Sequence, residues 1–167
     1  MPLRHKRHFM RTREINSILS EASCKLGINL EGIIGSRGEM ELVETDSAQI
    51  YLISGKPLLA RMSGRMLPTL VFEELLDSMP KVVVDMGAIP HVCNGANVMA
   101  PGIVRFEGEF NRGDLVLVVD EKHGKAVALC ESIYDVDTAR KLDEGIVFEN
   151  IHFVGDELWK LAKKFQK

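Results

Sequence analysis

Residues 82–104 read VVVDMGAIPHVCNGANVMAPGIV and predict a strand, a short helix and a second strand, joined by tight turns. The three valines that open the stretch are β-branched, as is typical of strands, and Gly87 breaks the run. Pro90 is tolerated in a helix only in the first turn, where an N–H has no partner, so the helix should cover residues 88–94. Gly95 can then close the helix in a left-handed conformation.

Small residues surround this helix on both sides, and Pro101 and Gly102 should bend the second strand. Glycine and alanine leave the neighbouring backbone N–H groups uncovered beside the start of the helix. Such a surface suits a phosphate or the backbone of another molecule. Tight turns and close packing of the helix require the same residue types, so both explanations stay open. The small residues are Gly87, Ala88, Gly95, Ala96, Ala100 and Gly102.

Two segments of the second half resemble one known domain. One segment, VDMGAIPHVCNGANVMAPGIV (84–104), resembles the signature of the PUA domain, a small β-barrel that binds RNA. The other, DEGIVFENIHFVGDELWKL (143–161), resembles the C-terminal end of that domain. The region before the PUA domain in the malignant T-cell-amplified-sequence proteins is similar to KPLLARMSGRMLPTLVFEELLDSMP (56–80). Those proteins are translation factors that partner density-regulated protein. The resemblance covers roughly residues 40–162 and identifies the chain as an archaeal-type, single-chain member of this family.

The resemblance implies where RNA would bind. In a PUA domain, RNA lies in a groove between the short helix and the last long strand. On that strand Asn150 and His152 alternate with Ile151, so we expect them to share one face, which either lines the edge of the groove or faces solvent. A nucleotide can approach small residues closely, and a single-stranded end can be read by its shape. The candidate RNA-binding residues are Met86, Gly87, Ala88, His91, Gly95, Ala96, Asn97, Val98, Met99, Ala100, Asn150 and His152.

The first half of the chain has the pattern of mixed helix and strand. Apolar residues at three- and four-residue spacing predict a helix over residues 10–27, capped by Thr12 and ended by Gly27. Residues 33–62 carry strand signals, and the turn at 54–56 predicts a hairpin within them.

A second helix is expected over residues 68–79, with Pro68 in its first turn and Pro80 after its end. We therefore expect an α+β N-terminal domain over residues 1–80. The remaining residues, 81–167, should form a mainly-β PUA-type pseudo-barrel that binds RNA.

Short strands at regular spacing support the barrel in the second domain. Asp137 is expected to cap a short helix that Gly145 ends, and residues 157–165 form a final strand or helix. The aromatic side chains Phe148, Phe153 and Trp159 stand in apolar stretches, which places them in the core. The expected strands cover residues 82–85, 96–104, 115–119, 126–134 and 146–154.

Basic residues are concentrated at the two ends of the chain. Residues 1–13 hold five basic groups and no acid, and residues 160–167 hold four lysines and no acid. Of the 21 basic and 24 acidic residues, 12 basic and 24 acidic ones lie between these ends, a net charge of −12. Phosphate contacts would therefore be local and salt-sensitive, unless the terminal charges only keep the protein soluble. Met86 and Pro90 stand where the family carries lysines, so RNA binding would be weaker or shared with the basic ends.

Composition excludes several classes of protein. The longest apolar run, residues 115–119, is far short of a membrane span, and the basic start has no apolar core like that of a secretory signal. Three widely spaced cysteines, Cys24, Cys93 and Cys130, favour the reducing cytoplasm.

Metal binding and catalysis are not expected. His5 and His8 are spaced as HxxH, and His91 and Cys93 are two apart, but no further paired ligands complete a tetrahedral site. The sequence has no GxSxG, no P-loop and no GxGxxG after a strand. We therefore expect no metal, no cofactor and no enzyme activity.

The resemblance implies a non-catalytic RNA-binding protein that acts in translation at the small ribosomal subunit. The groove would hold structured RNA, tRNA or rRNA, or the single-stranded CCA end of a tRNA. The N-terminal domain would dock the ribosome or a partner like density-regulated protein. Two alternatives stay open: an accessory subunit in tRNA or rRNA modification or ribosome assembly, and a protein-interaction module that does not bind RNA.

Overall fold

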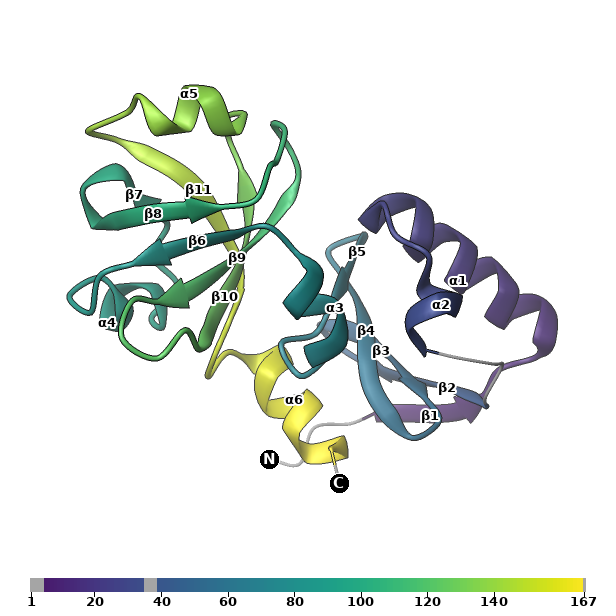
Figure 1. Cartoon of the computed structure of the whole chain (residues 1–167). Coiled ribbons are helices and arrows are strands. Elements are labelled where there is room, and N and C mark those ends of the chain that lie inside the picture. The colour runs from purple at the N-terminus through teal and green to yellow at the C-terminus, as the bar shows by residue number, and fades with distance from the viewer. Residues whose placement is uncertain (1–4, 35–38, 167) are drawn as a thin grey trace. The chain divides into compact units, whose positions relative to one another are not determined.

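The computed structural model describes residues 5–34 and 39–166, which form two compact units (Figure 1). One unit contains Met1–Leu75 together with Lys160–Lys167, and the other contains Leu76–Trp159. The predicted division after residue 80 stays a prediction, and the structure groups the end of the chain with the first unit. Arg4 and Lys167, two of the basic end groups, lie outside the described residues, as does the side chain of His5.

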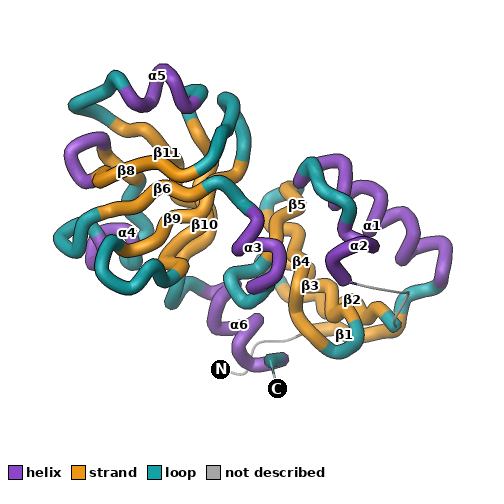
Figure 2. The backbone as a smooth tube through the Cα atoms, viewed as in Figure 1, coloured by secondary structure: helices purple, strands orange, loops and turns teal. Residues whose placement is uncertain are grey.

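The first unit is an antiparallel five-stranded sheet with helices beside it. Its elements are β1 (His5–Phe9), α1 (Thr12–Leu26), α2 (Leu30–Ile34), β2 (Met40–Thr45), β3 (Ala48–Ile53), β4 (Lys56–Met62) and β5 (Arg65–Pro68). The strands lie side by side in chain order, from β1 at one edge to β5 at the other. Helices α1 and α2 contact one another beside this sheet (Figure 2). This is the α+β arrangement that the sequence predicted.

Two turns of the first unit form as predicted. Gly27 follows α1 in the left-handed conformation, with φ of 68°, and its N–H bonds back to the carbonyl of Ser23. Ser54 and Gly55 both have positive φ, at 51° and 82°, and reverse the chain between β3 and β4. Such a pair matches the twist of the two flanking strands.

The prediction of a helix starting at Pro68 is wrong. Pro68 ends strand β5 and lies opposite Leu59 of β4. Because β5 is the outer strand of the sheet, its proline removes no bond to a further strand. The helix α3 (Glu73–Ser78) begins five residues later and leads from the first unit into the second.

Two further details of the first unit differ from the prediction. Thr12 is the first residue of α1 instead of its cap, and Arg11 takes the cap position without a side-chain hydrogen bond. Residues 30–34 form the short helix α2, although the strand signals were placed from residue 33 onwards. The basic segment before α1, for which no structure was predicted, forms the edge strand β1.

The second unit is a six-stranded sheet whose outer strands are joined by one tight turn. Its elements are β6 (Lys81–Val84), α4 (Ile89–Val92), β7 (Val98–Met99), the 3₁₀ turn η1 (Ala100–Gly102), β8 (Ile103–Glu107), β9 (Leu115–Asp120), β10 (Ala126–Ser132), α5 (Val136–Arg140), β11 (Ile146–Phe153) and the start of α6 (Glu157–Phe165). The strand order is β7-β11-β10-β9-β6-β8, with only β6 and β9 parallel among these pairs. Since η1 alone connects β7 to β8, the two edges of the sheet approach each other, as in a pseudo-barrel.

Three predictions for this unit need correction. The single bent strand expected over residues 96–104 is two strands on opposite edges of the sheet, because η1 at Pro101 and Gly102 redirects the chain. Asp135, not Asp137, caps α5 by accepting a hydrogen bond from the N–H of Thr138 at 2.7 Å. Helix α5 ends at Arg140, before the predicted stop at Gly145.

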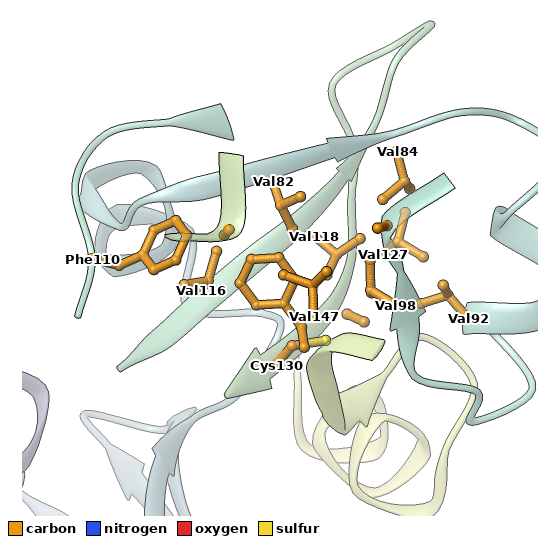
Figure 3. Packing of buried hydrophobic residues seen from close by; sticks show 14 of the residues in the cluster. Val82, Val84, Val92, Val98, Phe110, Val116, Val118, Val127, Cys130 and Val147 are labelled. Carbon is orange, nitrogen blue, oxygen red and sulfur yellow. The ribbon is translucent and has the colours of Figure 1, made fainter. Parts of the chain in front are cut away.

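Valines from five strands and α4 fill the core of this unit (Figure 3). Phe148 is fully buried, as predicted, and its ring centroid lies 5.5 Å from that of Phe110 and 6.2 Å from that of Phe106. Phe153 and Trp159 are only partly buried. Valine repeats at every second position of a strand, so one face of each strand points into the barrel. The central residues are Val82, Val84, Val92, Val98, Phe110, Val116, Val118, Val127, Cys130, Val147 and Phe148.

Candidate nucleic-acid interface

Helix α4 and the loops on either side of it present an exposed surface, at the end of the second unit opposite α5 (Figure 1). Pro90 lies in the first turn of α4, as predicted. Met86 and Met99 expose 42% and 46% of their surfaces, although methionine is usually buried. We name the exposed candidate residues the α4 surface; they are Met86, Gly87, His91, Gly95, Ala96, Asn97 and Met99.

Two of the candidate residues belong to the core. The side chains of Val98 and Ala100 are 2% and 8% exposed and pack with the valines of the barrel. The backbone N–H of Ala100 is not available to a ligand either, because it donates a hydrogen bond to the carbonyl of Gly145 at 2.9 Å. These two residues shape the surface from below and present no side chain to a ligand.

Most of the backbone N–H groups expected to be uncovered are hydrogen-bonded within the chain, so that part of the prediction is wrong. The N–H of Met86 donates to the Glu121 carboxylate at 3.2 Å, and the N–H of Ala88 donates to Asp85 Oδ1 at 2.8 Å. Those of Gly95 and Ala96 donate to the carbonyls of Val92 and His91. Within the described residues, the N–H groups of Gly87 and Asn97 make no hydrogen bond.

Asn150 of β11 ties the loop after α4 to the barrel. Its Nδ2 donates to the carbonyls of Val92 and Ala96, both at 3.0 Å, and its backbone N–H donates to Asn97 Oδ1 at 2.9 Å. The Oδ1 of Asn150 is buried and has no hydrogen-bond partner among the described residues. Asn97 and Asn150 therefore hold the α4 surface in place, and the Asn97 carboxamide oxygen is already engaged.

The expectation that His152 edges the groove beside Asn150 is wrong. His152 is 0% exposed, and its Nδ1 lies 2.8 Å from Asp156 Oδ2. The strands β10 and β11 pair Leu129 with His152 but the next residue, Cys130, with Asn150, which leaves Ile151 as a β-bulge. A bulge breaks the two-residue alternation of side chains, so Asn150 and His152 do not share a face.

The small residues around α4 serve close packing at two places. A Cβ added to Gly102 would lie 3.2 Å from the Cβ of Ala88, so the turn η1 approaches the start of α4 only because both residues are small. Gly95 has φ of 93°, and a Cβ there would lie 3.4 Å from the ring of Phe153. The packing explanation thus holds for Ala88, Gly95 and Gly102. Contact with a ligand remains open for the exposed ones.

Replacing Asn150 by aspartate should loosen the α4 surface. The change removes the donor that holds two carbonyls and places carboxylate oxygens against them, so we expect the free energy of unfolding to fall by about 1–3 kcal/mol. Urea unfolding at neutral pH measures it. Asn94→Asp is the matched control, because Asn94 is exposed in the same loop. Equal stability of the two variants would show that the hydrogen bonds of Asn150 do not anchor the loop.

Two side chains that position this surface, and one that caps α6, were not among the candidates. Glu121 holds the N–H of Met86, and the ring of Phe153 lies beneath Gly95. Asp156 accepts hydrogen bonds from the N–H groups of Phe153 and Trp159 at 2.9 and 2.7 Å, so it caps α6. An aspartate directly before an amphipathic run is a helix-start signal that could have revealed Asp156. The other two contacts join residues far apart in the sequence and carry no local signal.

No arrangement for metal binding is found in the part of the chain that the structure describes. Within it, no group of three or more histidine, cysteine, aspartate or glutamate side chains is placed to hold a metal ion.

Burial raises the pKa of the Cys93 and Cys130 thiols above the ordinary value. Asp85 and Asp114 accept backbone hydrogen bonds in turns. None of the described helices combines the length and the apolar character needed to cross a membrane.

Comparison with known proteins connects both units to established families. A PUA domain matches residues 80–154, and a domain of unknown function, DUF1947, matches residues 6–73. Malignant T-cell-amplified sequence 2 of Mus musculus is 33% identical over 156 residues, which cover 88% of this chain and 84% of that protein. Translation machinery-associated protein 20 of Saccharomyces cerevisiae is 27% identical over 158 residues, which cover 90% of this chain and 87% of that protein.

Among solved structures, a PUA domain from Aeropyrum pernix K1 in complex with tartrate matches with a TM-score of 0.81 and 28% identity, over 98% of this chain and 94% of that one. The fold and the α4 surface therefore define a PUA domain protein, the fold class that the sequence predicted. The chain belongs to the malignant T-cell-amplified-sequence family. The matched region begins at residue 6, well before the start of the resemblance read from the sequence. Family membership supports an RNA-related role in translation.

Proposed function

We propose that the protein is a non-catalytic RNA-binding factor of translation, whose α4 surface holds the single-stranded CCA end of a tRNA at the small ribosomal subunit. The first unit would dock the ribosome or a partner that resembles density-regulated protein. This role implies a cytoplasmic location. The observation that carries the proposal is an exposed and anchored α4 surface on a PUA domain whose relative is named for the translation machinery.

The chemistry of the α4 surface suits a single-stranded end better than a duplex. Met86 and Met99 offer exposed apolar side chains that nucleobases can cover, and His91 adds an exposed ring. The N–H groups of Gly87 and Asn97 are available to phosphate or base oxygens within the described residues. Little positive charge lies on this surface, so recognition would depend on shape and hydrogen bonds more than on long-range attraction to phosphate.

The test compares a tRNA that has its CCA end with the same tRNA trimmed of that end, at moderate salt. We expect the intact tRNA to bind more tightly. Ala96→Glu places a charge on the α4 surface and should weaken binding of the intact tRNA at least about tenfold, with no effect on the trimmed one. Ser47→Glu is the control, because it adds the same charge at an exposed turn of the first unit.

Other outcomes would replace the proposal with a different function. Equal binding of both tRNAs would contradict recognition of the CCA end and favour ribosomal RNA as the ligand. Co-purification with a catalytic chain would favour an accessory subunit in RNA modification. Binding of neither RNA would favour a protein-interaction module.

A further inference from the structure

The two basic ends of the chain, about 150 residues apart in the sequence, meet in the first unit. The guanidinium of Arg7 in β1 lies 5.3 Å from the ring centroid of Phe165 at the end of α6. A cation over an aromatic face at this distance is an attractive contact. The contact joins the basic strand at the start of the chain to the lysine-rich helix at its end.

One face of β1 carries this contact together with an exposed aromatic ring. Phe9 follows Arg7 by two residues, so both side chains point to the same face of the sheet, the face on which Phe165 lies. Phe9 is 64% exposed, more than any other large apolar side chain among the described residues. Since β1 is an outer strand, Phe9 has open space beside the sheet. A ring this exposed can be covered by a nucleobase that stacks on it.

The Arg7 side chain is held firmly enough to fix this geometry. Its Nε and Nη2 both donate to the carboxylate of Glu41 in β2, the second at 3.0 Å. A bidentate pair of this kind sets the direction of the guanidinium plane. Glu41 is 9% exposed, so it offsets the charge of Arg7 from the sheet side. The lysines of α6, in contrast, are exposed to solvent.

The lysines of α6 extend the positive charge along one side of the helix. Lys160, Lys163 and Lys164 are all exposed and follow the three- and four-residue spacing that places side chains on one helix face. The opposite face is buried through Leu161 and Ala162. The exposed cations of the two ends that the structure describes are Lys6, Arg7, Arg11, Arg13, Lys160, Lys163 and Lys164.

We propose that Phe9 of β1 and the lysines of α6 form a second RNA-binding surface, which holds single-stranded RNA by stacking a base on Phe9 and pairing phosphates with the lysines. The remainder of the chain, with a net charge of −12, repels phosphate, so these ends are where a polyanion can dock. Alternating cations and an exposed aromatic ring are the means by which proteins bind single strands without sequence preference. This surface is distinct from the α4 surface and goes beyond the proposed function.

The probe for the test is a uridine oligonucleotide of about 12 nucleotides, a length within the range that single-strand binding domains cover. The affinity is measured over a series of salt concentrations. Charge reversal of Lys160, Lys163 and Lys164 to glutamate should weaken binding and reduce the slope of log affinity against log salt by about 2, since each phosphate contact on a single strand contributes about 0.7. Phe9→Ala should weaken binding about fivefold or more with the slope unchanged.

A charge-matched control separates a local surface from the net charge of the protein. Lys25, Lys56 and Lys141 are exposed lysines outside these two ends, and their reversal to glutamate should leave most of the affinity in place. Equal losses of affinity for the oligonucleotide in the two triple variants would overturn the proposal. Wild-type affinity in both Phe9→Ala and the triple variant of α6 would overturn it as well. The exposed edge of β1 would then be better suited to an acidic protein strand. Ala96→Glu tests the α4 surface separately, so a loss there alone contradicts the second surface and leaves the proposed function standing.

Discussion

Replacing Phe148 by alanine should lower the free energy of unfolding of the PUA domain by about 3–5 kcal/mol. The side chain is fully buried in β11, and its ring packs at 5.5 Å from Phe110 and 6.2 Å from Phe106. Truncation removes the apolar surface of the ring and leaves a cavity that the rigid strands around it cannot fill. Both aromatic pairs are also lost, and such pairs add about 0.5–1.5 kcal/mol each beyond burial.

Urea unfolding followed by circular dichroism measures this effect. Phe148→Leu should lose less than half as much, because the leucine side chain fills most of the cavity. The matched control is Phe9→Ala, the same chemical change at a side chain that is 64% exposed, which should stay within about 0.5 kcal/mol of the wild type. A comparable loss at Phe9 and Phe148 would contradict the assignment of Phe148 as the centre of the core.

Local sequence patterns could predict most of the strands and their faces. The valines of β6 and β9 are β-branched and fill the core from parallel neighbouring strands, so their strand signal agrees with their environment. Gly27 and the turn at Ser54 and Gly55 adopt the positive φ values that these residue types favour. In each case the physical cause lies within a few residues of the element.

The failures have causes that act at long range. Pro68 is tolerated in a strand because β5 is at the edge of a sheet, which depends on where every other strand pairs. The residues around Pro101 form two strands, because β7 pairs with β11 at one edge of the sheet and β8 pairs with β6 at the other. No pattern within the segment itself could distinguish these outcomes from a helix or from one bent strand.

The position of the candidate interface at α4 stays a prediction, and the structure corrects the roles of several of its residues. The residues of the α4 surface are exposed, whereas the roles of individual residues depend on contacts across the fold. Asn150 anchors a loop that is 54 residues away in the sequence, at Ala96, and the bulge at Ile151 turns His152 into the core. A β-bulge depends on the partner strand, so the sequence of β11 alone does not reveal it.

Asp156→Ala should lower the free energy of unfolding by about 2–4 kcal/mol at neutral pH. The carboxylate caps α6 at the N–H of Trp159, and loss of a cap removes about 0.5–2 kcal/mol. It also accepts from the N–H of Phe153 and faces Nδ1 of His152, which is fully buried. Leaving a buried donor unpaired adds about 1–3 kcal/mol.

The effect of this substitution should depend on pH. Burial raises the pKa of Asp156, but the hydrogen bond and electrostatic attraction of His152, with the N–H groups of Trp159 and Phe153, outweigh it and lower the pKa below the ordinary value. A carboxyl whose pKa is lower in the folded state stabilises the fold above its unfolded pKa of about 4 and loses that contribution as the pH falls further. The difference between wild type and Asp156→Ala should therefore be fully present at about pH 5 and shrink below pH 4.

Trp159 is the single tryptophan of the sequence and lies three residues after this cap, so its fluorescence reports the unfolding of α6 and the barrel end together. Asp156→Asn should be intermediate, because an asparagine still caps a helix but offers one acceptor oxygen where the aspartate uses both. Asp137→Ala is the matched control, since Asp137 is 83% exposed and should show no measurable change. If the loss in Asp156→Ala were the same at pH 3 and pH 7, the ionised carboxylate would not be the group that holds His152, and the buried pair would owe its stability to packing alone.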